Sequence, residues 1–251
     1  MRIPMITAHS GCEGTARDSL DSVECAIRLG ADVVEMDIRK APDGAIRISH
    51  NCCSQEEYVL KPRLEEVFDY IKDTSLALNC DLKESNVVYE VLQLAKSFAF
   101  DSERIIFSGC LSPEQLARDA SLVQQAGVYL NIEEILKFMA VATLFEKHQE
   151  NQFCNLMNTP WEFVRGCDLT EDLMESIIVM LQTLKVRGLN MPYTLLGADF
   201  AEKLRKSNIP FSVWTVNTPD LMERAIQMGA ANITTQNVKG AMSCRKELRG
   251  F

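Results

Sequence analysis

The stretch VVEMDIRKAPDGAIRISH, from Val33 to His50, decides the fold of this chain. It opens with apolar residues around Glu35 and Asp37, which the two-residue period of a strand places on the same face. A Val/Ile-rich run that follows a helical pattern is typical of a parallel core strand, covered on both sides. Burying two like charges there is unfavourable unless a cation neutralises them. The pair is therefore the first indication of a cation-binding site.

The second half of this stretch predicts a hairpin. Asp43-Gly44 is typical of a turn, and Ile46 to His50 of a returning strand. A hairpin centred on that turn brings His50 roughly level with Asp37. One short segment is thus expected to hold two carboxylates and an imidazole together.

Length and charge limit the possible classes of protein. The chain has 251 residues, of which 47% are hydrophobic and 24% charged, ordinary values for a globular protein. An α/β barrel typically has about 250 residues. The net charge of −9 argues against non-specific nucleic-acid binding, which needs a basic face, but is compatible with an acidic cation site.

The cysteines and the N-terminus favour a cytoplasmic protein. Nine cysteines are scattered through the chain without the spacing of a zinc site, which is typical of reduced thiols. The N-terminal MRIPMITAHSG has too short an apolar run for a signal peptide, and no later run is long enough to span a membrane. The oligomeric state stays open.

Strand and helix patterns alternate along the chain. Strands are expected at Ile6–His9, from Val33, and at Leu76–Lys83, Arg104–Ser108, Gly127–Asn131, Gly188–Pro192, Phe211–Val216 and Asn232–Thr235. Helices are expected from Asp18 or Ser19 to Gly30, and at Leu64–Ile71, Asn86–Ala99, Pro113–Ala120, Glu133–Glu146, Glu171–Leu184, Gly197–Lys206 and Pro219–Met228.

Two segments do not fit this alternation. Cys52 to Pro62 is expected to be a loop, and Gln149 to Val164, which has no clean period, a lid or an irregular connection. About eight βα units remain, without a break in composition. They predict one domain over residues 1–251 with a (β/α)8 TIM-barrel fold.

In such a barrel, side chains at the C-terminal ends of the strands form the active site. The chemically active or bulky residues at predicted strand ends are His9, Glu35, Asp37, Asp81, Lys83, Trp214 and Thr235. We expect them to converge at one end of the barrel.

The acids among them offer hard oxygen ligands. Glu35, Asp37 and Asp81 suit Mg²⁺ or Ca²⁺, although each alone could be a solvated or ion-paired acid. Lys83 is either a counter-ion for these acids or a group that holds an anionic oxygen. Trp214 either fills the barrel or walls a substrate pocket.

Histidines at strand ends suit acid–base chemistry at neutral pH. His9 and His50 lie on either side of the acidic strand in the sequence and are candidates for this role. His148, between Lys147 and Gln149, is expected to be a solvated surface residue.

In this order, the motifs resemble the glycerophosphodiester phosphodiesterase family, of the TIM-barrel phosphodiesterase superfamily. The match spans almost the whole chain. The motifs are His9-Ser10-Gly11, Asp18-Ser19-Leu20, Gly30-Ala31-Asp32, Glu35-Met36-Asp37-Ile38-Arg39, Asp43-Gly44, His50-Asn51, Leu64-Glu65-Glu66-Val67, Asp81-Leu82-Lys83, Trp214-Thr215-Val216-Asn217 and Gly229-Ala230.

The resemblance implies a role for each of these residues. Glu35, Asp37 and Asp81 would bind the divalent metal, His9 and His50 would be the catalytic acid–base pair, and Lys83 would bind phosphate. Ser10 and Trp214 are at the expected substrate-binding positions. Aspartate as the third ligand is similar to the spider-venom-type sphingomyelinases D.

The chain departs from the family pattern at three positions. Ser10 replaces the arginine that follows the first histidine, which removes a guanidinium fork suited to phosphate. Asp18 replaces the glutamate of the helix start, and Gln236 follows Thr235 where the family usually has Thr-Asp.

The expected activity is metal-dependent hydrolysis of small glycerophosphodiesters to an alcohol and glycerol 3-phosphate. One alternative is a lysophospholipase D or sphingomyelinase D-like enzyme, which should show an apolar loop at Tyr58–Leu60 or Phe153–Trp161. The other is a non-catalytic binder of phosphorylated ligands, suggested by the missing arginine and the shortened acids.

Overall fold

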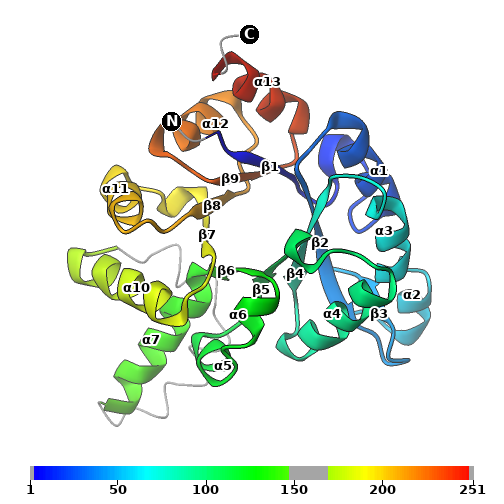
Figure 1. The fold of residues 1–251 in the computed structure, drawn as a ribbon, viewed down its shortest axis with the longest axis horizontal. Coiled ribbons are helices and arrows are strands. Elements are labelled where there is room, and N and C mark those ends of the chain that lie inside the picture. Colours follow the sequence, from blue (N-terminus) through cyan, green and yellow to red (C-terminus); the bar gives the residue numbers. More distant parts are fainter. Residues whose placement is uncertain (1–2, 147–168, 249–251) are drawn as a thin grey trace.

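Eight parallel strands close into a barrel in the computed structural model, which describes residues 3–146 and 169–248 (Figure 1). Strand β1 pairs with β2 on one side and with β9 on the other, so the ring is complete. The barrel strands are β1 (Met5–Ala8), β2 (Val33–Lys40), β4 (Ala77–Leu82), β5 (Ile105–Gly109), β6 (Gly127–Asn131), β7 (Gly188–Pro192), β8 (Phe211–Trp214) and β9 (Asn232–Thr235). The predicted (β/α)8 fold is confirmed.

The hairpin predicted around Asp43-Gly44 is also present. Strand β3 (Ile46–Ile48) runs antiparallel to β2, with Ile48 opposite Ile38. The pairing continues for one residue, because the Ser49 amide donates to the Asp37 carbonyl at 2.9 Å. His50 therefore returns next to the acidic part of β2, as expected.

Helices surround the barrel (Figure 1). Helix α1 (Leu20–Leu29) begins where the Ser19 side chain accepts a hydrogen bond from the Ser22 amide, and it ends at Gly30 in a left-handed conformation. The other helices are α2 (Gln55–Val59), α3 (Leu64–Ile71), α4 (Val88–Ser97), α5 (Pro113–Arg118), α6 (Leu122–Gln125), α7 (Ile132–Glu146), α10 (Glu171–Leu184), α11 (Ala198–Lys206), α12 (Pro219–Met228) and α13 (Val238–Leu248).

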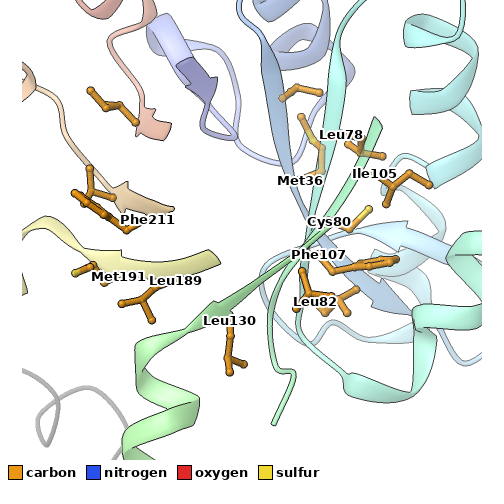
Figure 2. Packing of buried hydrophobic residues seen from close by; sticks show 14 of the residues in the cluster. Met36, Leu78, Cys80, Leu82, Ile105, Phe107, Leu130, Leu189, Met191 and Phe211 are labelled. Carbon is orange, nitrogen blue, oxygen red and sulfur yellow. The ribbon is translucent and has the colours of Figure 1, made fainter. Parts of the chain in front are cut away.

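Alternation along each strand separates the core from the site. In β4, Leu78, Cys80 and Leu82 belong to the cluster of buried hydrophobic residues that packs the barrel (Figure 2). The residues between them, Asn79 and Asp81, line a cavity at the barrel end. The two-residue period thus sends one set of side chains into the packing core and the other to the site.

The structure corrects the prediction for Cys52 to Pro62. Part of this segment is helix α2, whose Ser54 side chain accepts from the Glu57 amide while the Glu57 side chain accepts from the Ser54 amide. Helix α13, after the last strand, was not predicted. Within the described residues, no helix is long and apolar enough to cross a bilayer.

Candidate active site

Three carboxylates meet at the C-terminal ends of two neighbouring strands. Glu35 and Asp37 follow each other on one face of β2, and Asp81 of β4 lies directly opposite Asp37 in the sheet register. One oxygen from each of the three acids lies within 4.8 Å of the others. The prediction that these three acids converge is confirmed, and burial leaves Glu35 only 6% and Asp37 only 1% exposed.

Lys83 lies between two of these acids. Its Nζ is 2.6 Å from Asp37 Oδ1, and it also forms an ion pair with Asp81 Oδ2. Burial lowers the pKa of Lys83, but the charges of Asp81 and Asp37 outweigh burial and raise the pKa above its usual value. The lysine is therefore a counter-ion of the acids, and it also lines the cavity.

The acidic cluster fits a hard divalent cation. Burial, partly opposed by His9 and reinforced by the negative charges of Asp37 and Asp81, raises the pKa of Glu35 to about 7. Three carboxylates, two of them buried, outnumber the cations that pair with them, Lys83 and Arg17, and so leave negative charge that a divalent cation would neutralise. Carboxylate oxygens are the ligands that Mg²⁺ and Ca²⁺ prefer.

A glycine makes room for the third acid. Gly109, at the end of β5, has φ +87°, and a Cβ there would lie 2.3 Å from the Leu82 carbonyl oxygen and 2.8 Å from Asp81 Oδ1. A side chain at this position would displace the Asp81 carboxylate. Ser108 then donates its hydroxyl to Asp81 Oδ1 at 3.0 Å.

His9 follows β1 at the edge of the acidic cluster. Its Nδ1 lies 2.8 Å from the Ser10 carbonyl oxygen and 4.0 Å from Glu35 Oε2. Because a carbonyl oxygen can only accept, Nδ1 carries the proton and Nε2 holds the lone pair in the neutral ring. His9 lines the cavity.

His50 lies in the same cavity and is fixed on three sides. Its amide donates to Asp18 Oδ2 at 3.0 Å, and its carbonyl accepts from Arg39 Nε at 3.2 Å. Its Nδ1 lies 2.9 Å from Asn51 Oδ1, which leaves Nε2 for proton transfer. Asp18, the shortened acid of the helix start, therefore positions this histidine.

Of the two residues expected to bind substrate, Trp214, at the end of β8, lines the cavity and Ser10 does not. Ser10 is fully buried, and its hydroxyl accepts from the Asp18 amide at 2.8 Å. The structure does not bring the Ser10 side chain to the cavity, although its amide donates to Glu35 Oε2 at 3.1 Å.

Thr235, at the end of β9, does not line this cavity. Thr235 is buried, and its hydroxyl donates to Asn217 Oδ1 at 3.2 Å. His148 and the segments 149–164 and 153–161 lie outside the described residues.

Arg17 and Glu133 are among the cavity residues that were not predicted as site residues. Arg17, in the loop between β1 and α1, places Nη2 3.1 Å from Asp37 Oδ2. Glu133, in the first turn of α7, is only 6% exposed, and its Oε2 is buried without a hydrogen bond. Glu133 comes two residues after the end of β6, so the rule that site residues follow the C-terminal ends of the strands could have found it. Arg17 carries no such signal.

The cavity has a volume of about 440 Å³, enough for a small molecule. Among the residues that line it are His9, Arg17, Glu35, Asp37, Arg39, His50, Asp81, Lys83, Glu133, Lys137 and Trp214. This arrangement brings a candidate cation site, two imidazoles and several positive charges to one opening.

Comparisons with known proteins find similarity over most of the chain. No family model matches the chain. An uncharacterized protein of Bacillus subtilis, YqiK, is 22% identical over 239 residues, which cover 92% of this chain and 93% of that protein.

Solved structures share the fold over nearly the whole chain. A glycerophosphodiester phosphodiesterase from Parabacteroides distasonis is 18% identical, with a TM-score of 0.69 and 99% of each chain covered. A phosphodiesterase from Oleispira antarctica, in complex with the product sn-glycerol-3-phosphate, is 16% identical, with a TM-score of 0.68 and 97% of each covered. A glycerophosphodiester phosphodiesterase from Thermotoga maritima is 20% identical, with a TM-score of 0.65. The match covers 97% of this chain and 99% of that protein's chain. The chain has the barrel fold of these enzymes.

Proposed function

We propose that this protein is a metal-dependent glycerophosphodiester phosphodiesterase that releases an alcohol and glycerol 3-phosphate. The observation that carries the proposal is the convergence of Glu35, Asp37 and Asp81 in one cavity with His9 and His50. The shared fold with glycerophosphodiester phosphodiesterases supports the choice of reaction. The product bound to the Oleispira antarctica phosphodiesterase supports the choice of substrate.

Glu35, Asp37 and Asp81 would hold a divalent cation, Mg²⁺ or Ca²⁺. When bound, this cation supplies positive charge to a non-bridging phosphate oxygen. Lys83 adds a second positive charge beside the acids and would attract the same anionic group.

The two histidines would move the protons. One neutral imidazole accepts a proton at Nε2 from the nucleophile, either water or a glycerol hydroxyl beside the phosphorus. A new P–O bond forms, and the bond to the alcohol breaks. Water as the nucleophile gives glycerol 3-phosphate directly, whereas a glycerol hydroxyl gives a cyclic phosphodiester that a water molecule then opens to glycerol 3-phosphate. The other histidine, protonated beforehand, donates its Nε2 proton to the leaving alkoxide. Each proton transfer contributes about 10² to 10⁴ in rate.

A lysophospholipid or sphingomyelin phosphodiesterase is the second candidate, because α2 and its end present exposed apolar side chains. Val59 is 59% and Leu60 84% exposed, whereas Tyr58 of the same predicted loop is buried. Leu60 also lines a hollow that it shares with Asp18 and Cys52, close to His50 in the sequence. These residues could contact an acyl chain.

A direct assay separates these functions. The protein is incubated with Mg²⁺ and either glycerophosphocholine or lysophosphatidylcholine, and the products are followed by ³¹P NMR. We expect glycerol 3-phosphate from glycerophosphocholine, and no reaction in EDTA. Faster cleavage of the lysolipid would favour the second candidate.

The non-catalytic alternative has its own outcome. Binding of glycerophosphocholine without release of glycerol 3-phosphate, whichever divalent cation is added, would support a phospho-ligand binder and contradict the proposed enzyme.

We further propose that the protein acts in the cytoplasm on small molecules, as the sequence predicts.

A further inference from the structure

Arg17 places a guanidinium in the cavity beside the acidic cluster. Its side chain is 48% exposed, and Nη2 lies 3.1 Å from Asp37 Oδ2. A guanidinium has five N–H donors in a planar fork. Asp37 accepts from one of its nitrogens, so most of the donors are left for another acceptor in the cavity.

The other cations described along this cavity have closer or more numerous partners. Lys83 pairs with two acids, and Arg39 pairs with Glu84 at 2.8 Å and donates to the His50 carbonyl. Lys137 pairs with Glu134 at 2.6 Å. Of these four side chains, Arg17 is the most exposed and keeps the most donors for an anionic ligand.

The loop that carries Arg17 is held in place by its neighbours. The Asp18 amide donates to Ser10 Oγ at 2.8 Å, and the Thr15 hydroxyl donates to the Cys12 carbonyl at 2.7 Å. Gly11 has φ +84°, and a Cβ there would lie 3.5 Å from Arg17 Cα, so the loop folds closely over this glycine. The Arg17 backbone is thus fixed, and the side chain enters the cavity from a defined point.

Ser10 holds the loop that carries Arg17. The serine at position 10 is buried and uses its hydroxyl to fix the loop, so that position contributes no charge to the cavity. The loop that it fixes delivers a guanidinium to the same opening.

We propose that Arg17 is a phosphate-binding residue of this site, which binds the non-bridging oxygens of the substrate phosphate with its free donors. This inference rests on the proposed function, because it takes a phosphate in the cavity as given. Arginine forks match the geometry of phosphate oxygens and can bind two at once. Arg17 thereby sets the affinity for the phosphate group rather than moving a proton.

A simpler role for Arg17 is to neutralise Asp37. The two roles differ in what they predict for an uncharged substitution. If Arg17 only neutralises Asp37, Arg17→Gln leaves phosphate binding unchanged and strengthens cation binding. If Arg17 binds phosphate, the same substitution weakens phosphate binding.

The test is calorimetric titration of glycerol 3-phosphate into the whole protein in Mg²⁺. We expect Arg17→Gln to weaken binding about 10-fold or more, and Arg17→Lys to weaken it less, because lysine keeps the charge but loses the fork. The matched control is Arg118→Gln, which changes an arginine that is 78% exposed and pairs with Glu114 outside this cavity. Binding by this control should equal that of the wild type.

Two further measurements complete the test. The melting temperatures of both Arg17 variants show that they fold, and Mg²⁺ titration shows that the acids still bind the cation. In hydrolysis of glycerophosphocholine, Arg17→Gln should raise KM more than it lowers kcat.

Three outcomes would overturn the inference: unchanged glycerol 3-phosphate affinity in Arg17→Gln, a loss of Mg²⁺ affinity by the same factor, or no binding of glycerol 3-phosphate by the wild type. Failure of the proposed function has a different result. If the wild type binds glycerol 3-phosphate through Arg17 but cleaves no diester, the Arg17 assignment holds and the enzyme assignment fails.

Discussion

Lys83 Nζ lies 2.6 Å from Asp37 Oδ1, and the same ammonium group also pairs with Asp81. The contact joins the ends of two neighbouring strands, β2 and β4, inside the cavity. Lys83 therefore pairs with two of the three candidate cation ligands, and Asp37 has a second, more exposed partner in Arg17. This relationship makes the cluster sensitive to the loss of either the lysine or a bound cation.

Lys83→Met should destabilise the protein in the absence of a cation. Removing one partner of a buried ion pair leaves uncompensated charge and typically lowers the free energy of unfolding by about 3–5 kcal/mol. Urea unfolding in EDTA measures the effect, and Mg²⁺ should restore part of the loss. Lys203→Met, which breaks surface pairs with Glu171 and Glu175, is the control and should change little. Equal stability of Lys83→Met and the wild type in EDTA would contradict this account of the cluster.

Cation binding should depend on pH through Glu35. Burial raises the pKa of Glu35 to about 7, so a proton competes with the cation below that pH. The rise in melting temperature on adding Mg²⁺ or Ca²⁺ should be small at about pH 5 and large at about pH 8. Glu35→Gln should lose most of this rise. The interpretation fails if the rise is the same at both pH values or persists in Glu35→Gln.

Glu133→Gln should stabilise the protein at high pH. Burial raises the pKa of Glu133 from 4.5 to about 7, so between these values the folded protein keeps a proton that the unfolded chain has lost. Stability due to this group is therefore lost as pH rises through that window. In EDTA at about pH 8, Glu133→Gln should raise the free energy of unfolding by about 1–3 kcal/mol, with little change at about pH 4.

Urea unfolding at the two pH values measures this difference. The control is Glu134→Gln, which removes the neighbouring acid that pairs with Lys137 at 2.6 Å and should give no such gain. A Glu133→Gln variant that is no more stable than the wild type at about pH 8 would contradict the expected pH dependence.

His9→Gln and His50→Gln should each abolish most hydrolysis. Loss of one proton-transfer group typically lowers kcat by about 10² to 10⁴. The affinity for glycerol 3-phosphate should stay within a few-fold of that of the wild type, because the acids, Lys83 and Arg17 are unchanged. His148→Gln is the histidine control, since the sequence places His148 away from the strand ends. Near-full activity of either variant would remove that histidine from the mechanism.

The sequence could predict the strands and the acids because both follow a short period. In β2, alternation alone places Glu35 and Asp37 on one face, and the turn at Asp43-Gly44 returns His50 beside them. Such local rules extend to Asp81 and Lys83, which come at the end of the next barrel strand. The barrel then brings strand ends together whatever their distance in the sequence.

The position of Arg17, which the sequence did not reveal, depends on loop geometry. Arg17 reaches Asp37 because the loop folds over Gly11 and is held by Ser10, and no periodicity reports that. The hydrogen bond from the Asp18 amide to the Ser10 hydroxyl also explains why the Ser10 side chain does not line the cavity. Helix α13 was missed because Gly240 interrupts its helical pattern and only part of one face is buried.

The central claim is that Glu35, Asp37 and Asp81 hold one divalent cation between the two histidines. The most direct measurement is the anomalous difference density of crystals soaked with Mn²⁺. We predict one strong peak at about 2.0–2.3 Å from an oxygen of each of the three carboxylates. No peak in this cavity, or a peak that one of the three acids does not reach, would contradict the claim.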